Sequence, residues 1–178
     1  MRARAAILVG CALLTGCSSL SAPSTTSKLA QAQATHQYPA PAPPAETITG
    51  AGAPGAVAAI KAFATVYINW TASTVARRML ALAAGSVGQA RSVVALAASE
   101  TAGDYELRRG GIANSGTVEA VAPLSGHENE YVVVTRERTT ATNSSAYAGL
   151  APAWHVTLAT VRQVAAGVWA VSGWQPES

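Results

Sequence analysis

Cysteine is almost absent from this chain. The only two, Cys11 and Cys17, lie within the first 17 residues, so everything after Cys17 lacks a thiol. This excludes a disulfide from the body of the chain. Motifs typical of a catalytic site are also lacking downstream of Cys17, so the sequence indicates a location more clearly than an activity.

Charge is scarce as well. The chain carries 12 Lys and Arg residues and 9 Asp and Glu residues. Two of the basic residues, Arg2 and Arg4, belong to an expected leader, which leaves 10 basic against 9 acidic residues, a net charge of +1. Because nucleic-acid affinity depends on clustered positive charge, we expect no direct binding of nucleic acid.

The first 17 residues have the pattern of a secretory leader. Arg2 and Arg4 precede an apolar run at 5–14, which is too short to cross a bilayer because a spanning helix needs about 20 apolar residues. The run leads into Leu-Thr-Gly-Cys, ending at Cys17, which resembles the bacterial lipobox. The resemblance implies a signal peptide at 1–16, acylation of Cys17 with fatty acids such as palmitate, and a lipid anchor on the extracytoplasmic face of the cell membrane. The alternative is a chance cysteine in an ordinary signal peptide.

The residues after Cys17 divide into a tether and a domain. Residues 17–53 are rich in Ser, Thr, Ala, Gln and Pro and lack apolar periodicity, which predicts a disordered tether. As a flexible coil it would place the domain about 30 Å from its anchor. Residues 54–176 are then expected to form a single domain of about 125 residues, an ordinary size for one core.

The first half of this domain has helical periodicity. Apolar residues that recur at three- and four-residue spacing predict three helices. These helices are expected at about 54–70, 75–84 and 86–103. Ser73 or Thr74 is expected to cap the second helix, and Ser86 with Gln89 forms a capping-box pattern at the start of the third.

The second half changes to β-branched runs separated by turn residues. Four strands are expected at 117–124, 131–140, 153–164 and 168–174. In the third strand Trp154, Val156 and Leu158 alternate with other residues, as is typical of a sheet with one buried side. Helices followed by antiparallel strands predict an α+β fold, with three N-terminal helices packed on a sheet of about four strands.

This element order resembles the nuclear-transport-factor-2-like (cystatin-like) fold, in which a curved sheet wraps around a long helix. The resemblance covers roughly residues 54–175 and rests on element order. A tethered extracytoplasmic domain of this kind is similar to TcpC-like conjugal-transfer domains and to type IV secretion bridge subunits. The tracts YVVVTRERTT at 131–140 and AWHVTL at 153–158 are also similar to proteins of actinobacterial mobile elements. Bridge subunits are normally held by a transmembrane helix, whereas this chain is expected to use lipid.

The leader, the tether and the resemblance together predict a non-catalytic lipoprotein. It would act as a protein-interaction module of a cell-envelope assembly, such as a conjugative DNA-transfer or secretion machine. The expected partners are other envelope or transfer-machine proteins, a second copy of the chain, and the membrane through the lipid anchor. No cofactor and no metal are expected.

The alternative is a small-molecule binder or an enzyme that uses the cavity of the cone-shaped fold. The residues that we expect to line this cavity are Tyr67, Trp154 and His155. SnoaL-like enzymes of the same superfamily use His and Asp in the cavity, so the resemblance implies His155 as a base. Asp104 and Glu119 are the acids that could accompany it, although no spacing in the sequence brings them within hydrogen-bond reach.

Two clusters of polar residues are interpreted as ordinary surface features and not as binding sites. The tract 127–130 reads His-Glu-Asn-Glu, but ligands this close in sequence rarely converge on a metal, so a polar hairpin turn is predicted. Arg136 and Arg138, with the Arg pair at 108–109, could form a basic patch for an acidic partner. Because Glu137 lies between the first two, we interpret them as part of a mixed surface.

Overall fold

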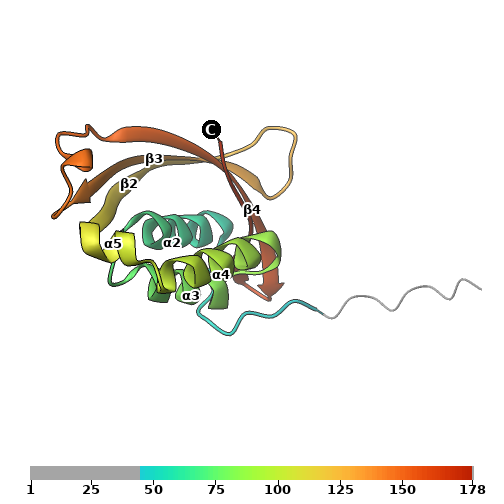
Figure 1. The fold of residues 1–178 in the computed structure, drawn as a ribbon. Coiled ribbons are helices and arrows are strands. Elements are labelled where there is room, and N and C mark those ends of the chain that lie inside the picture. Colours follow the sequence, from blue (N-terminus) through green and yellow to red (C-terminus); the bar gives the residue numbers. More distant parts are fainter. Residues whose placement is uncertain (1–44, 178) are drawn as a thin grey trace, which may run out of the picture. The chain divides into compact units, whose positions relative to one another are not determined.

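The computed structural model describes residues 45–177 (Figure 1). The signal peptide, Cys17 and most of the tether lie outside the described residues. The elements are α2 (Ala56–Ile68), β1 (Trp70–Thr71), α3 (Val75–Ala84), α4 (Gly88–Ala102), α5 (Tyr105–Gly110), β2 (Ile112–Pro123), β3 (Glu130–Ala141), the 3₁₀ turn η1 (Ser145–Tyr147), β4 (Ala153–Ala165) and β5 (Val168–Pro176). No helix in this part of the chain is long and apolar enough to cross a membrane.

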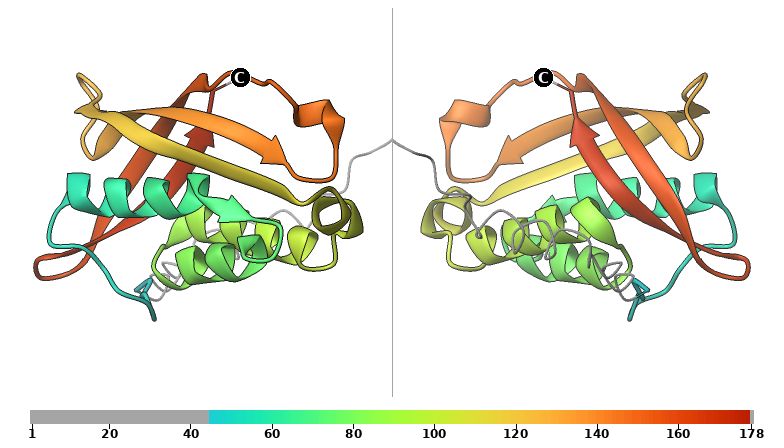
Figure 2. Two further views of the ribbon diagram at one scale, coloured as in Figure 1. Left: turned by 90° about the vertical axis from the view of Figure 1, so that its left-hand side faces the viewer. Right: turned by 90° about the vertical axis from the view of Figure 1, so that its right-hand side faces the viewer.

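The predicted α+β class is confirmed. The strands form one antiparallel sheet in the order β1-β2-β3-β4-β5, so each strand pairs with the next one along the chain. The sheet curls into a half-barrel, and the helices lie on its inner side, with α2 in contact with β2, β4 and β5 (Figures 1 and 2). This arrangement is consistent with a nuclear-transport-factor-2-like cone.

Irregular pairing explains the curl. The register of β2 against β3 shifts between Val118 and Ala120, which leaves Glu119 without a partner. The register of β4 against β5 shifts twice, between Thr160 and Val161 and again further along the hairpin. An extra residue on one strand bends the strand and increases its twist. The sheet therefore wraps around α2 instead of lying flat.

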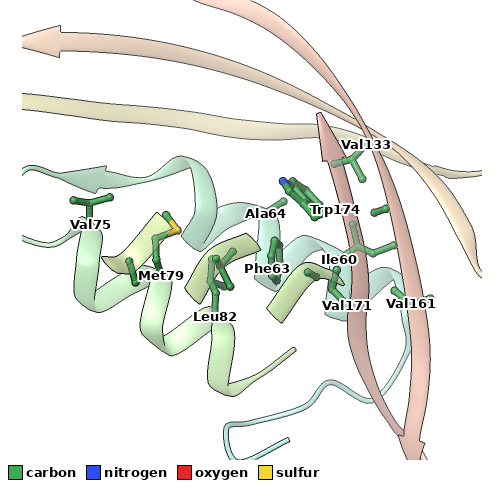
Figure 3. Packing of buried hydrophobic residues seen from close by; sticks show 14 residues of the cluster. Ile60, Phe63, Ala64, Val75, Met79, Leu82, Val133, Val161, Val171 and Trp174 are labelled. Carbon is green, nitrogen blue, oxygen red and sulfur yellow. The ribbon is translucent and has the colours of Figure 1, made fainter. Parts of the chain in front are cut away.

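The core fills the space between the curled sheet and the helices (Figure 3). Trp174 of β5 is its largest fully buried side chain, with 1% of its surface exposed. Its ring centroid lies 4.9 Å from that of Phe63 and 5.4 Å from that of Tyr67, both on α2. One aromatic cluster therefore joins the last strand to the first described helix.

Two side-chain amides bind backbone groups that no neighbouring strand covers, one on β2 beyond its short pairing with β1 and one on the edge strand β5. Asn69 donates from Nδ2 to the carbonyl oxygen of Gly116 (3.1 Å) and accepts from the N–H of Gly116 at Oδ1 (3.0 Å). Gln89 does the same on β5, donating to the carbonyl oxygen of Trp174 (3.2 Å) and accepting from its N–H (2.8 Å). Each amide thus makes the pair of bonds that a further strand would make, which covers edge groups otherwise open to pairing with another chain.

The Gln89 contact also corrects the predicted capping box. Ser86 does not cap α4, because its Oγ donates to the carbonyl oxygen of Leu82 (2.7 Å), and the residue at the N-cap position is Val87. Thr74 occupies the N-cap position of α3, but its side chain accepts from the N–H of Thr71 (2.9 Å) and makes no cap bond. Both polar side chains therefore hold segments together in place of capping a helix.

We expect Gln89→Ala to lower the free energy of unfolding by about 1–3 kcal/mol, because it leaves two part-buried backbone groups of Trp174 without partners. Urea denaturation of the full chain measures the effect. The matched control is Gln175→Ala, which removes an exposed amide from the same strand and should change the free energy by no more than about 0.5 kcal/mol. Equal effects of the two substitutions would contradict the role given to Gln89.

The remaining differences from the sequence prediction are local. The second predicted helix is confirmed at Val75–Ala84, and the other two begin and end within about two residues of the prediction. The two-residue strand β1 and the six-residue helix α5 were not predicted, so the sheet has five strands where about four were expected. Both elements are too short to show a period in the sequence.

Candidate functional site

A cavity of about 590 Å³ lies at one end of the half-barrel, between the inner face of the sheet and the helices. Its apolar wall includes Trp70, Val75, Met79 and Leu150. Polar side chains project into the same space from several elements: Tyr67 from α2, Thr101 from α4, Asn114 from β2, Glu137 and Thr139 from β3, and His155 from β4. A mostly apolar cavity of this size with a few converging polar groups is typical of a small-molecule site.

Glu137 is the centre of the polar network. One carboxylate oxygen, Oε1, accepts from the hydroxyl of Thr135 at 2.6 Å, and the other, Oε2, accepts from Nδ2 of Asn114 at 2.7 Å. Asn114 is in turn fixed by its bond to the carbonyl oxygen of Ile68 (2.8 Å) and by the hydroxyl of Thr139 (3.1 Å). The carboxylate is therefore held in place by neutral donors.

The environment of Tyr67 favours its neutral form. Burial raises the pKa of the Tyr67 phenol, the negative charge of Glu137 raises it further, and the nearby indole N–H of Trp174 acts in the opposite direction. That N–H is buried without a hydrogen bond of ordinary geometry among residues 45–177. Figure 3 shows the indole nitrogen turned toward the side on which Val75 and Met79 lie. Tyr67 therefore presents an uncharged hydroxyl and an aromatic ring to the cavity.

The three predicted cavity residues lie on both sides of the sheet. Tyr67 and His155 line the cavity. Trp154 does not line it. In β4 every second residue faces the helices, and Thr157 and Ala159 are among these inward residues. Trp154 lies on the opposite face, with 62% of its surface exposed. The alternation in β4 is real, but the larger apolar residues lie on its outer side.

The acids considered as partners of His155 lie elsewhere. Asp104 caps α5 by accepting from the N–H of Leu107 (3.0 Å), and Glu119 accepts from the hydroxyl of Thr117 (2.6 Å) at the bulge of β2. His155 itself pairs across the sheet with Thr135 and has no carboxylate within hydrogen-bond distance in the described part of the chain. The arrangement supplies groups that can bind and orient a molecule.

Glu137 is the residue that the sequence prediction missed. The sequence analysis counts Glu137, together with Arg136 and Arg138, as part of a mixed outer surface. In the structure Glu137 faces inward, opposite Gly116, while Arg136 and Arg138 face outward, opposite Thr117 and Ser115. Counting in steps of two from the buried Val133 would have placed it inside.

The outer face of the sheet is the second surface of interest. Cross-strand pairs place Val132 beside Leu158, Val134 beside Val156, and Arg136 beside Trp154. The Val156 side chain is 41% exposed, and the guanidinium carbon of Arg136 lies 5.7 Å from the centroid of the Trp154 ring, within reach of a cation–π interaction. These six residues, with Arg138, form what we call the outer patch. The helices of the described chain all lie on the other side of the sheet (Figure 2).

The His-Glu-Asn-Glu tract forms the turn between β2 and β3. Asn129 adopts a left-handed backbone conformation with φ of 62°, and Nδ1 of His127 lies 3.3 Å from Oε2 of Glu130. Within residues 45–177, no three His, Cys, Asp or Glu side chains are grouped so that they could hold a metal ion. The tract therefore has the geometry of a local turn.

A comparison with protein-family models gives no match, and a comparison with curated proteins gives none either. The described part of the chain has two surfaces with the properties of binding sites. The inner one is a cavity around a fixed carboxylate, and the outer one is an apolar patch bordered by arginines.

Proposed function

We propose that this chain is an exported lipoprotein, anchored through Cys17, whose α+β domain is a non-catalytic protein-interaction module of a cell-envelope assembly. The leader and the lipobox-like tetrapeptide support the location, and the Pro-rich tether supports a domain that reaches away from the membrane. A conjugative DNA-transfer or secretion machine is the finer form of the proposal, and the order of leader, tether and α+β domain supports it.

The outer patch is the observation that carries the proposal. An exposed tryptophan beside an arginine is the composition found at the energetic centre of protein interfaces. Val156 is exposed beside Trp154, and the half-buried Val132, Val134 and Leu158 lie on the same face of the sheet. Exposed apolar side chains that are grouped in this way mark interaction sites more often than single ones do. The patch therefore has the properties of a docking surface.

The two arginines of the outer patch indicate the chemistry of the partner. Arg136 and Arg138 make no ion pair with other residues in the range 45–177. Their nearest acidic neighbour in sequence, Glu137, is turned into the cavity. We propose that the partner is a protein with an apolar pocket for the indole of Trp154 and with carboxylates around that pocket, because opposite charges at the rim favour correct encounter and orientation.

Replacement of the exposed tryptophan tests this function. After crosslinking in cells and purification of the full chain from membranes, Trp154→Ala should lower the yield of a specific envelope partner by about tenfold or more, as expected for a central interface residue. Leu96→Ala is the control, because Leu96 is 59% exposed on α4, away from the sheet. If both variants recover the partner as well as the unmodified chain does, or if no envelope protein is recovered, the proposal is wrong. Recovery of only a second copy of the chain would assign the patch to self-association.

A second candidate function is the binding of a small molecule. One observation favours it, namely the cavity of about 590 Å³ into which Tyr67, Asn114, Glu137 and His155 all project. The cavity and the outer patch lie on opposite faces of the sheet. A ligand in the cavity and a protein on the patch would therefore not compete for space.

A further inference from the structure

We infer that the cavity binds an organic cation, namely an ammonium group attached to an apolar body, with Glu137 as the residue that selects the positive charge. The inference rests on the second proposed function, the binding of a small molecule, and adds to it the chemical class of the ligand.

The charge of the cavity wall is the first reason. Among the described side chains that line the cavity, Glu137 is the one with a formal charge at pH 7 when histidine is counted as neutral. No Lys or Arg lines the cavity to balance it. Buried charges in proteins are normally paired with an opposite charge, whereas the part-buried Glu137 has two neutral hydrogen-bond donors and no ion pair among residues 45–177. A cationic ligand would supply the partner that the chain lacks.

The geometry of the carboxylate is the second reason. The hydroxyl of Thr135 and the amide of Asn114 each occupy one site on a different oxygen of Glu137. A carboxylate has about four acceptor sites, so two remain for an ammonium group. Because Asn114 is itself held by the carbonyl oxygen of Ile68, the carboxylate is positioned before a ligand arrives. This rigidity lowers the entropy lost on binding.

The remaining wall suits the rest of such a ligand. The rings of Tyr67 and Trp70 offer aromatic faces, which attract cations by about 0.5–1 kcal/mol at accessible sites. Val75, Met79 and Leu150 form an apolar surface for the ligand body. An anionic ligand of the same shape would instead meet the charge of Glu137, with no Lys or Arg in the described wall to offset the repulsion.

Three probes that differ only in their head group test the inference. Phenylbutylamine, phenylbutanol and phenylbutyrate share one aromatic body and carry a cationic, a neutral and an anionic group at neutral pH. We would titrate each into the full chain, made as Cys17→Ser to avoid acylation, and measure affinity by calorimetry. NMR shifts of the Asn114 and Thr139 amides would locate the bound probe. The amine should bind about tenfold more tightly than the alcohol, a difference of about 1.4 kcal/mol, and the carboxylate should bind more weakly than both.

A variant then assigns the preference to one residue. Glu137→Gln keeps the size of the side chain but removes its charge and replaces one acceptor oxygen with a donor NH₂ group. The amine and the alcohol should therefore bind this variant equally well. Glu119→Gln is the matched control, because Glu119 is exposed on β2 outside the cavity, and it should keep the preference. The three-probe comparison on unsubstituted Glu137 decides the charge preference even if Glu137→Gln does not fold.

The outcomes separate this inference from the function on which it rests. If the alcohol or the carboxylate binds at Asn114 and Thr139 as tightly as the amine, the cation inference is wrong and small-molecule binding stands. If no probe binds there, both are wrong. If Glu119→Gln loses the preference and Glu137→Gln keeps it, the assignment to Glu137 is wrong.

Discussion

Trp174→Ala is expected to lower the free energy of unfolding by about 3–5 kcal/mol, the usual cost of truncating a large buried aromatic side chain. The indole is 1% exposed and packs against the rings of Phe63 and Tyr67. Removing the indole leaves a cavity between β5 and α2. Because β5 already packs on α2, the two elements cannot move together enough to fill this cavity. Denaturant unfolding of the full chain, followed by circular dichroism, measures the loss.

Two further variants show whether the loss comes from burial of the side chain at position 174 and not from the loss of any tryptophan. Trp154→Ala removes the same atoms from an exposed site, so it should cost less than about 1 kcal/mol. Trp174→Phe keeps an aromatic ring in the core and removes an indole N–H that has no hydrogen-bond partner in the described chain. It should therefore cost clearly less than Trp174→Ala, because no satisfied polar group is lost. If Trp154→Ala destabilises the protein as much as Trp174→Ala does, the assignment of inner and outer faces is wrong.

The elements that sequence analysis predicted well are those with a strong local period. The helix at Val75–Ala84 and the strands from Glu130 onward were placed within about two residues, because runs of apolar or β-branched residues define them. The assignment of faces was harder. In β4 the strand alternates as predicted, but the positions that face the helices are those of the buried Thr157 and Ala159, and Trp154 is out of step with them. The large Trp154 therefore lies outside.

Contacts between distant parts of the chain could not be predicted in this way. Gln89 binds Trp174 across 85 positions, and Asn69 binds Gly116 across 47. Nothing in the local sequence distinguishes such an amide from a helix cap, so the capping-box interpretation of Gln89 was a natural error. Gly116 illustrates the same limit, because a Cβ there would lie 2.6 Å from the carbonyl oxygen of Arg136. Only the paired strands show why that position has no side chain.

The cavity contains residues that the sequence predicts and one that it does not. Tyr67 and His155 were named from the sequence and line the cavity. Glu137, the residue that gives the cavity its charge, was read from its arginine neighbours as part of a surface. Its inward direction follows from the period of two in β3, but its hydrogen bond to Asn114 depends on the pairing of β2 with β3. Strand pairing is a long-range property that residue types alone do not determine.

Cys17→Ser is expected to abolish the attachment of fatty acids to the protein. Anchoring by lipid depends on the number of buried methylene groups, at about 0.8 kcal/mol each, and a single acyl chain gives only marginal, reversible binding. Stable attachment therefore requires several chains at one site, and the lipobox resemblance places that site on the sulfur of Cys17. Without the sulfur no thioether forms. Labelling of cells with a tagged fatty acid, followed by purification of the full chain, measures the change.

Cys11→Ser is the matched control, because it removes the other cysteine of the chain from within the apolar run of the leader. Cys11 would leave with the cleaved peptide, so this variant should incorporate fatty acid as the unmodified chain does. Mass spectrometry of the unmodified protein should find an N-terminus at Cys17 with the added mass of acyl chains. If Cys17→Ser incorporates fatty acid as the unmodified chain does, or if the mature N-terminus carries no acyl group, the lipid anchor is wrong. The domain would then need another route to the envelope before the outer patch could meet a partner there.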